Sequence, residues 1–304
     1  MLNDNRSYFR IKCSQIKFNI MEKITGYKEE KSRFKKLLGY NLNLSNPRTF
    51  NEKVVWKKIY DRNPLLPITA DKFLVREYLK KQLGKERAEH ILIPLLHATH
   101  EPETIPFKAL PDEYVIKANH ASRCNIFANK DCRLDQQDVI RQCRQWLSYS
   151  YGCYHHEWAY QKIRPMIVVE KLLKDQTGNL PLDYKFFVFH GKCEFIQVDS
   201  ERYNNHARCI YDPDWNLLDF KKDTTIKQGL PISKPDNLND MLVLAENIAI
   251  KFDFVRIDLY SIDNNIFFGE ITHYPASGTS KFEPPEYDTI VGSYWKIKPK
   301  YWLS

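Results

Sequence analysis

The chain has 304 residues, of which 43% are hydrophobic and 28% charged, and its formal net charge is +8. This composition is typical of a folded protein and argues against extensive disorder. The longest apolar runs, such as residues 91–96 and 166–170, fall far short of the roughly 20 residues that a membrane-spanning helix needs. We therefore expect no transmembrane segment, and the polar N-terminus (residues 1–6) lacks the apolar core of a signal peptide.

The charge and the cysteine content indicate the cellular compartment and the kind of partner. The seven cysteines form no Cys-x-x-Cys pair, which favours reduced thiols in a cytoplasm over disulfides or a zinc site. Much positive charge lies in residues 28–36 and 80–87. These stretches are either solvated helix faces or attract an anionic partner, such as a nucleotide, an acidic sugar polymer or the inner membrane surface. No nucleic-acid-binding signature is present, so we expect no nucleic-acid partner.

The first 110 residues are expected to be a mostly helical region. A helix is predicted at residues 28–38, and Thr49 and Glu52 form a capping box that begins another. A further helix is predicted from 69 to 83, ended by Gly84. On that helix a solvated polar cluster is expected, made of Asp71, Lys72 and Arg76.

Strands begin after Pro111. Residues 114–117 favour a strand, followed by a polar loop at 118–125 and a short strand at 126–127. A helix at 136–149 and a strongly apolar strand at 166–170 come next. The adjacent pair His155 and His156 is too close to face one metal from a helix, so we expect a structural role.

The last part of the chain predicts two β-hairpins. Residues 183–189 and 193–198 flank His190-Gly191, and residues 255–260 and 266–271 flank Asp263-Asn264-Asn265. An amphipathic helix at 236–252 lies between them. Because helices come first and mixed elements follow, the expected fold class is α+β.

The second hairpin carries two carboxylates that face each other. Asp258 and Glu270 lie near the strand ends away from the turn, where both could bind one cation. Mg²⁺ favours a few carboxylate oxygens together with phosphate oxygens and water. The alternative is an ordinary ion pair with Arg256.

Several other residues have weaker signals. Lys117 ends an apolar strand just before a polar loop, a position from which lysine can contact phosphate. Residues 170–172 end the most apolar strand, where a purine could lie. Asp212-Pro213-Asp214 matches the Asp-x-Asp form of nucleotide-sugar metal sites, although Pro213 and Trp215 favour a turn. An acidic substrate, or alternatively only solvent, is expected to contact Arg202, His206 and Arg208.

The order of these features resembles the ATP-grasp superfamily, and more closely its TupA-like branch, found among bacterial cell-surface polysaccharide genes. The resemblance covers most of the chain, from about Asn46 to Gly292. It is carried by residues 46–53 (NPRTFNEK), 60–64 (YDRNP), 70–72 (ADK), 114–120, 183–187 (DYKFF), 212–215 (DPDW), 254–260 and 268–278.

The resemblance implies two α+β lobes around a nucleotide cleft. The small ATP-binding lobe would be residues 111–172, and residues 173–304 would form a larger lobe with metal and substrate residues, after the helical region 1–110. Lys117 would contact the ATP phosphates, and the loop that contains Ser122 would cover them. Glu170 and Leu172 would hold the adenine, and Asp183 would bind the ribose. The catalytic and metal positions would be Arg256, facing the transferred phosphate, and Asp258, Glu270 and Thr272, holding Mg²⁺.

Two positions depart from the superfamily pattern. The phosphate loop, usually glycine-rich, contains no glycine here, so Ser122 and Arg123 would replace backbone contacts with side chains. Thr272 stands where an asparagine is usual, and a hydroxyl is a weaker Mg²⁺ ligand than an amide oxygen.

The resemblance implies a ligase that uses ATP and Mg²⁺ as cofactors. It would be cytoplasmic or peripheral to the inner face of the membrane. It would join an amino acid or amine to a uronic-acid sugar through an acyl phosphate, in capsule or O-antigen synthesis. The acidic sugar would be free, nucleotide-linked or lipid-linked. Two alternatives are a glycosyltransferase of polysaccharide synthesis and a non-catalytic ATP-binding protein.

Overall fold

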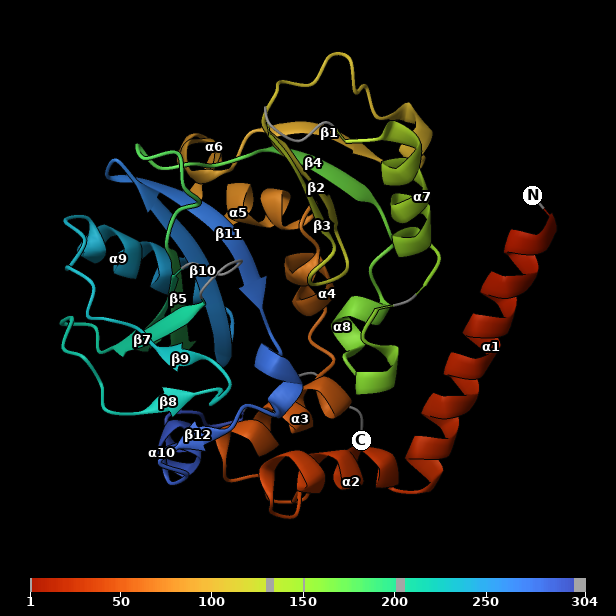
Figure 1. The fold of residues 1–304 in the computed structure, drawn as a ribbon. Helices are drawn as coiled ribbons and strands as arrows, with labels where there is room; N and C mark the ends of the chain where they lie inside the picture. Colours follow the sequence, from red (N-terminus) through yellow and green to blue (C-terminus); the bar gives the residue numbers. More distant parts are fainter. Residues whose placement is uncertain (1, 130–133, 150, 201–205, 298–304) are drawn as a thin grey trace. The chain divides into compact units, whose positions relative to one another are not determined.

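A computed structural model describes residues 2–129, 134–149, 151–200 and 206–297 (Figure 1). The described part mixes helices and sheets, which confirms the α+β class, and none of its helices is long and apolar enough to cross a membrane. The chain forms two compact units. The first unit comprises Met1–Ser32, Pro64–Val75 and Ile93–Leu172, and the second unit comprises Arg33–Asn63, Arg76–Leu92 and Leu173–Ser304.

Helices dominate the N-terminal region, as predicted. Thr49 and Glu52 form the expected capping box: the Thr49 hydroxyl accepts from the Glu52 N–H at 3.2 Å, and the Glu52 carboxylate accepts from the Thr49 N–H at 3.1 Å. The helices are α1 (Leu2–Ile24), α2 (Lys28–Leu38), α3 (Phe50–Tyr60), α4 (Leu65–Ala70), α5 (Val75–Leu83) and α6 (Lys85–Ile91).

One predicted helix is wrong. The stretch 69–83 is divided between α4 and α5, because Asp71 accepts hydrogen bonds from the N–H groups of Phe73 at 2.8 Å and Leu74 at 3.2 Å. These contacts turn the backbone out of the helix. Asp71 is 3% exposed, so the expected solvated position is also wrong for this residue.

The first unit contains a four-stranded antiparallel sheet in the order β1-β4-β2-β3. One face packs on α7 through an apolar cluster that includes Ile116, Val169 and Trp146. Since side chains alternate along a strand, Lys117 and Glu170 lie on the other face. The elements are β1 (Leu95–Thr99), η1 (Pro102–Thr104), β2 (Tyr114–Ala118), β3 (Asn125–Ala128), α7 (Gln136–Leu147), η2 (Cys153–His155), α8 (Trp158–Gln161) and β4 (Ile167–Lys171).

The second unit contains a six-stranded sheet in the order β11-β10-β5-β6-β7-β9. Both predicted hairpins are confirmed, as β5/β6 and β10/β11. All neighbouring strands are antiparallel except β7 and β9. The elements are β5 (Asp183–Phe189), β6 (Lys192–Ser200), β7 (Ala207–Tyr211), β8 (Lys221–Lys222), β9 (Lys227–Gln228), α9 (Leu238–Ala249), β10 (Phe254–Ile262), β11 (Asn265–Thr272), η3 (Pro275–Gly278), β12 (Phe282–Glu283) and α10 (Tyr287–Ser293).

The two faces of this sheet differ sharply. One face is apolar, with Phe186 and Ile257 fully buried, and α9 packs on β5, β6 and β10. The opposite face is aromatic at one end of the strands, where Phe187 and Phe254 surround Phe50 of α3. Its other end is polar and carries the residues of the candidate site.

Gly292 on α10 gives the first test of this packing. A Cβ at this position would lie 2.8 Å from the Phe50 N and would also meet the Arg48 carbonyl. We expect Gly292→Ala to lower the free energy of unfolding by about 2 kcal/mol in urea titrations, because a methyl group would overpack the contact between α10 and the start of α3. The neighbouring exposed variant Ser293→Ala is the control, and equal midpoints for the two variants would contradict this account.

Candidate functional site

The first unit brings two predicted residues together. Lys117 on β2 donates a hydrogen bond from Nζ to Glu170 Oε2 on β4 at 2.8 Å. Their side chains are 19% and 9% exposed, so the pair is largely shielded. Leu172 is buried directly after β4, and its N–H donates to the Glu113 carbonyl at 3.4 Å.

The loop between β2 and β3 is held without glycine. Asn119 anchors it by accepting from the Met166 N–H at 2.8 Å and by donating to Asp71 at 3.0 Å. Arg123 adopts φ +61°, a left-handed conformation that normally favours glycine. Ser122 is exposed, and its hydroxyl accepts from the Tyr151 hydroxyl at 3.1 Å.

A polar row crosses the second unit's sheet. Strand register places Glu270 opposite Asp258, Asp258 opposite Lys185, and Lys185 opposite Gln197. A second row, two residues along β5, pairs Asp183 with Asp199 and Asp199 with Arg208. Directly opposed side chains on one sheet face are within contact distance, whatever their separation in the sequence. The face therefore gathers charged groups from five neighbouring strands.

Arg256 is the centre of the hairpin end of this row. It donates to both carboxylate oxygens of Asp258 at 2.6 Å, to Glu270 at 3.1 Å and to the Thr272 hydroxyl at 2.9 Å. Thr272 in turn donates to Glu270 at 3.1 Å. The structure thus joins all four predicted residues, and it has the ion-pair arrangement that the sequence left open as the alternative to a metal site.

Lys185 occupies the middle of the row. Its Nζ forms an ion pair with Asp183 and lies 3.5 Å from Asp199 and 3.6 Å from Asp258. Sequence analysis gave Lys185 no role, although the spacing Asp183-x-Lys185 in a strand puts both side chains on one face. Asp199 was missed altogether, because no local pattern marks it.

The charges of the row control one another's ionisation. Burial raises the pKa of Asp258 to about 6, with Asp183 and Glu270 adding to the rise and Arg256 and Lys185 opposing it. For Asp199, burial is outweighed by Lys185 and Arg208, and its pKa is lowered below the ordinary value. A further cation near Asp258 would favour its ionised form.

These residues fit a Mg²⁺ ion that brings phosphate and water ligands. In the described residues no group of three His, Cys, Asp or Glu side chains is placed to hold a metal by itself. Asp258 and Glu270, directly opposed on adjacent strands, provide two carboxylates, and Mg²⁺ bound with phosphate needs only one or two.

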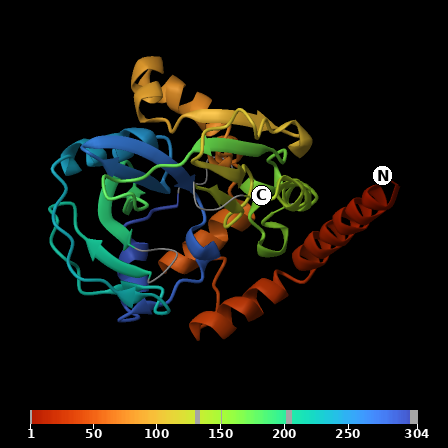
Figure 2. The same cartoon turned by 45° about the horizontal axis from the view of Figure 1, so that its top comes forward.

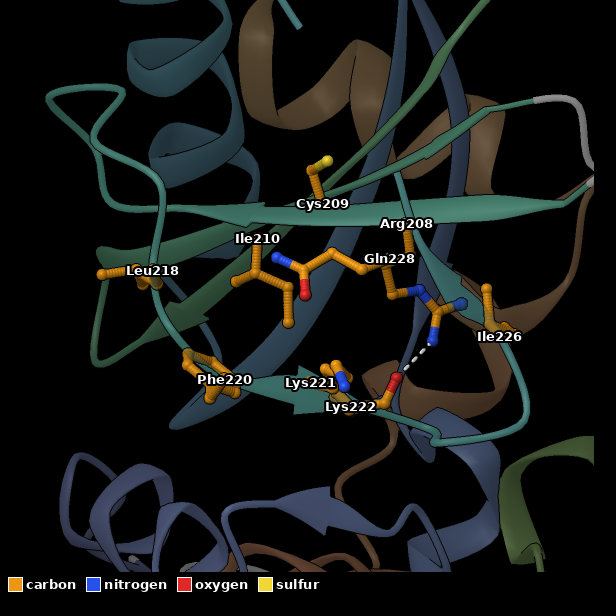
Figure 3. Close-up of a pocket in the computed structure, with 9 residues that line it drawn as sticks. All are labelled: Arg208, Cys209, Ile210, Leu218, Phe220, Lys221, Lys222, Ile226 and Gln228. Atoms are coloured by element: carbon orange, nitrogen blue, oxygen red, sulfur yellow. Dashed lines mark hydrogen bonds between the residues drawn. The ribbon is translucent and has the colours of Figure 1, made fainter. Parts of the chain in front are cut away.

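Two of the predicted substrate residues, His206 and Arg208, lie at the other end of the face. Arg208 donates to Asp199 at 2.6 Å and to the Lys222 carbonyl at 2.6 Å, and His206 Nε2 lies 3.3 Å from Asp199. Arg208 also lines a small pocket together with Ile210 and Phe220 (Figure 3). Arg202 lies outside the described residues.

Asp212 has a structural task in this unit. One of its carboxylate oxygens accepts from the Asn216 N–H at 2.8 Å, and the other accepts from the Asn216 side chain at 2.9 Å. Both oxygens therefore stabilise the turn after β7, a common use of aspartate. This geometry supports the turn that the sequence favoured over an Asp-x-Asp metal site.

Lys222 is a buried cation that sequence analysis missed. Its side chain is 4% exposed, donates to the Ser280 hydroxyl at 3.0 Å and lies 5.3 Å from the Phe187 ring centre. Burial, together with the positive charges of Arg208 and Arg256, lowers its pKa to about 7, and Asp223 and Asp199 oppose this shift only in part.

This lowered pKa predicts a pH-dependent stability. An unfolded lysine titrates near pH 10.4, so the folded state binds fewer protons above about pH 7 and stability should rise with pH across that window. We expect Lys222→Met to unfold at higher urea concentration than wild type near pH 7, by a margin that shrinks toward pH 10. Lys221→Met, at the more exposed neighbour, is the control, and a margin that stays constant with pH would refute the lowered pKa.

Comparisons with known proteins identify the family of the chain. A sequence model of the TupA-like ATP-grasp family matches residues 52–296. No curated protein matches the chain in sequence. Among solved structures, the chain is similar to D-alanine–D-alanine ligase from Bacillus anthracis (18% identity, 68% of this chain, TM-score 0.40) and from Helicobacter pylori (14%, 75%, 0.39), and to phosphoribosylamine–glycine ligase from Thermotoga maritima (11%, 72%, 0.38).

The chain spans 57%, 63% and 52% of the lengths of these three proteins. The family match, in contrast, covers most of this chain, including both hairpins and every described residue of the polar row. It confirms the family expected from the sequence. The chain therefore belongs to the TupA-like ATP-grasp family.

Proposed function

We propose that the protein is an ATP-dependent carboxylate–amine ligase that joins an amino acid or amine to a uronic-acid sugar. The observation that carries the proposal is the cluster on β10 and β11, where Arg256 lies within hydrogen-bonding distance of Asp258, Glu270 and Thr272. A guanidinium beside two opposed carboxylates suits phosphoryl transfer, in which charge must be neutralised on the transferred group. The product would enter a cell-surface polysaccharide such as capsule or O-antigen.

ATP would be held by two sets of residues, each within one unit. In the first unit Lys117 would contact the phosphates as a compact positive charge, with Ser122 in the covering loop. Glu170 and Leu172, at the end of β4, would receive the adenine through backbone and side-chain contacts. In the second unit Asp183 would accept from the ribose hydroxyls.

Asp258 and Glu270 would hold Mg²⁺, with Thr272 as a weaker oxygen ligand. Bound Mg²⁺ would neutralise charge on the β- and γ-phosphates. Arg256 now donates to both carboxylates, so ATP binding would redirect its guanidinium toward the γ-phosphate. Lys185 would keep Asp258 in place meanwhile, because it lies 3.6 Å from that carboxylate on the side away from Glu270.

The acceptor would bind near Arg202, His206 and Arg208. A guanidinium binds carboxylate through two parallel hydrogen bonds, which suits an acidic sugar in free, nucleotide-linked or lipid-linked form. The sugar carboxylate would attack the γ-phosphorus and release ADP. The amine would then displace phosphate from the acyl phosphate and form an amide. We place this reaction in the cytoplasm or at the inner face of the membrane.

The direct test is coupled turnover. We expect ADP release from ATP and Mg²⁺ only when galacturonate or glucuronate derivatives and an amino acid are both present, with an amide product seen by mass spectrometry. An acceptor-dependent release of nucleoside diphosphate from a sugar nucleotide without ATP would instead favour a glycosyltransferase. ATP binding without turnover on any acceptor would leave only a non-catalytic role.

The metal assignment predicts which substitutions abolish turnover. Asp258→Asn and Glu270→Gln should each lower kcat by about 10²- to 10³-fold and raise the Mg²⁺ concentration needed for half-maximal rate, because each removes a charged ligand. Asp214→Asn is the matched control on an exposed acid, and it should retain the wild-type rate. Full turnover by either of the first two variants would refute the assignment, and loss of turnover in the third would revive the Asp-x-Asp site.

A further inference from the structure

The helix α1 has one face that the first unit buries well. Glu22 is 2% exposed, and its carboxylate accepts from the N–H groups of Glu29 at 3.0 Å and Glu30 at 3.1 Å. His156 lies 3.2 Å from the same carboxylate, in the structural role expected for it, and its ring stacks on Phe18 at 5.3 Å. These contacts fix which side of the helix faces inward.

The other side of α1 is apolar and exposed. Ile16, Ile20 and Ile24 recur every four residues and so lie along one side of the helix. Their exposed fractions are 57%, 53% and 74%, and the adjacent Met21 is 50% exposed. Single exposed apolar residues are ordinary, but four within nine residues of one helix form a continuous patch. We call Ile16, Ile20, Met21 and Ile24 the isoleucine stripe.

Positive charge flanks this stripe. At 100° per residue, the exposed Lys17 and Lys23 lie about 60° to either side of the line through Ile16, Ile20 and Ile24, and Met21 lies beyond Lys17. The first 36 residues contain ten Lys and Arg against four Asp and Glu, whereas the other 268 residues contain 36 against 34. Most of the net charge of +8 is therefore concentrated at the end of the chain that carries the stripe.

We propose that the isoleucine stripe binds the surface of an anionic membrane, with α1 lying in the plane of the interface. Such a helix inserts its apolar side chains between the lipid acyl chains. The lysines along its flanks then lie against the acidic headgroups. A second copy of the chain fits less well, because pairing two stripes would bring the flanking lysines of both copies together. The inference deepens the location given in the proposed function, and it would place the enzyme next to a lipid-linked acceptor.

Co-sedimentation with lipid vesicles tests this surface. The full chain should bind phosphatidylethanolamine vesicles that contain phosphatidylglycerol, and should not bind phosphatidylcholine vesicles. Ile16→Asp combined with Ile20→Asp should weaken binding more than tenfold, because charges would replace apolar side chains that insert into the membrane. Lys17→Glu with Lys23→Glu should weaken it at least tenfold and reduce its sensitivity to salt.

Leu230→Asp is the matched control, since Leu230 is 87% exposed but lies in the second unit. It should bind vesicles like wild type, and all variants should keep the wild-type unfolding temperature and the wild-type turnover of soluble substrates. Absence of binding to anionic vesicles, or binding unchanged by the isoleucine substitutions, would overturn the proposal. A wild-type dimer in light scattering that the same substitutions dissociate would overturn it too, in favour of a second copy. Loss of turnover with intact vesicle binding would count only against the ligase.

Discussion

The second unit depends on the mutual neutralisation of charges buried on one face of its sheet. An isolated carboxylate there would cost several kcal/mol, and removing one partner of such a pair commonly costs 3–5 kcal/mol, roughly half the stability of a domain. Lys185 and Arg256 prevent this cost, because each contacts more than one acid. The apolar residues of the opposite face, covered by α9, provide the burial that makes a charged face tolerable. The site is therefore a balanced network, which a ligand with its own charge can rearrange.

Local patterns were enough to predict the elements that carry this network. Both hairpins follow from alternation around a turn, and the turn residues His190, Asp263 and Asn264 indeed have positive φ. The helix at 69–83 was mispredicted because its break depends on Asp71, whose carboxylate accepts from the N–H groups of Phe73 and Leu74 and also from the side chain of Asn119, 48 residues away. Contacts between residues far apart in the sequence cannot be read from the periodicity of apolar residues.

The same distinction explains which site residues were found. Arg256, Asp258, Glu270 and Thr272 lie on one hairpin, so turn position alone places them together. Asp199 reaches the row only through the pairing of β5 with β6 and β7, and Lys222 through the packing of a two-residue strand. Their roles are set by tertiary register, which a single sequence does not reveal. The candidate nucleotide residues were proposed for a different reason, since the family resemblance depends on motif order rather than on contact.

The strands β10 and β11 lie side by side in Figure 1 and in the turned view of Figure 2. Their pairing also has a consequence for the order of folding. Arg256 and Glu270 are 14 residues apart and joined by a short turn, so their contact closes a small loop and such hairpins form within about 10 μs. Lys185 is 73 residues from Asp258, and that pairing must wait for the slower docking of β10 on β5. The contact of Arg256 with Asp258, which lies within β10, would compensate the charge of Asp258 during this interval. Arg256 would thus stabilise the hairpin before the rest of the sheet has formed.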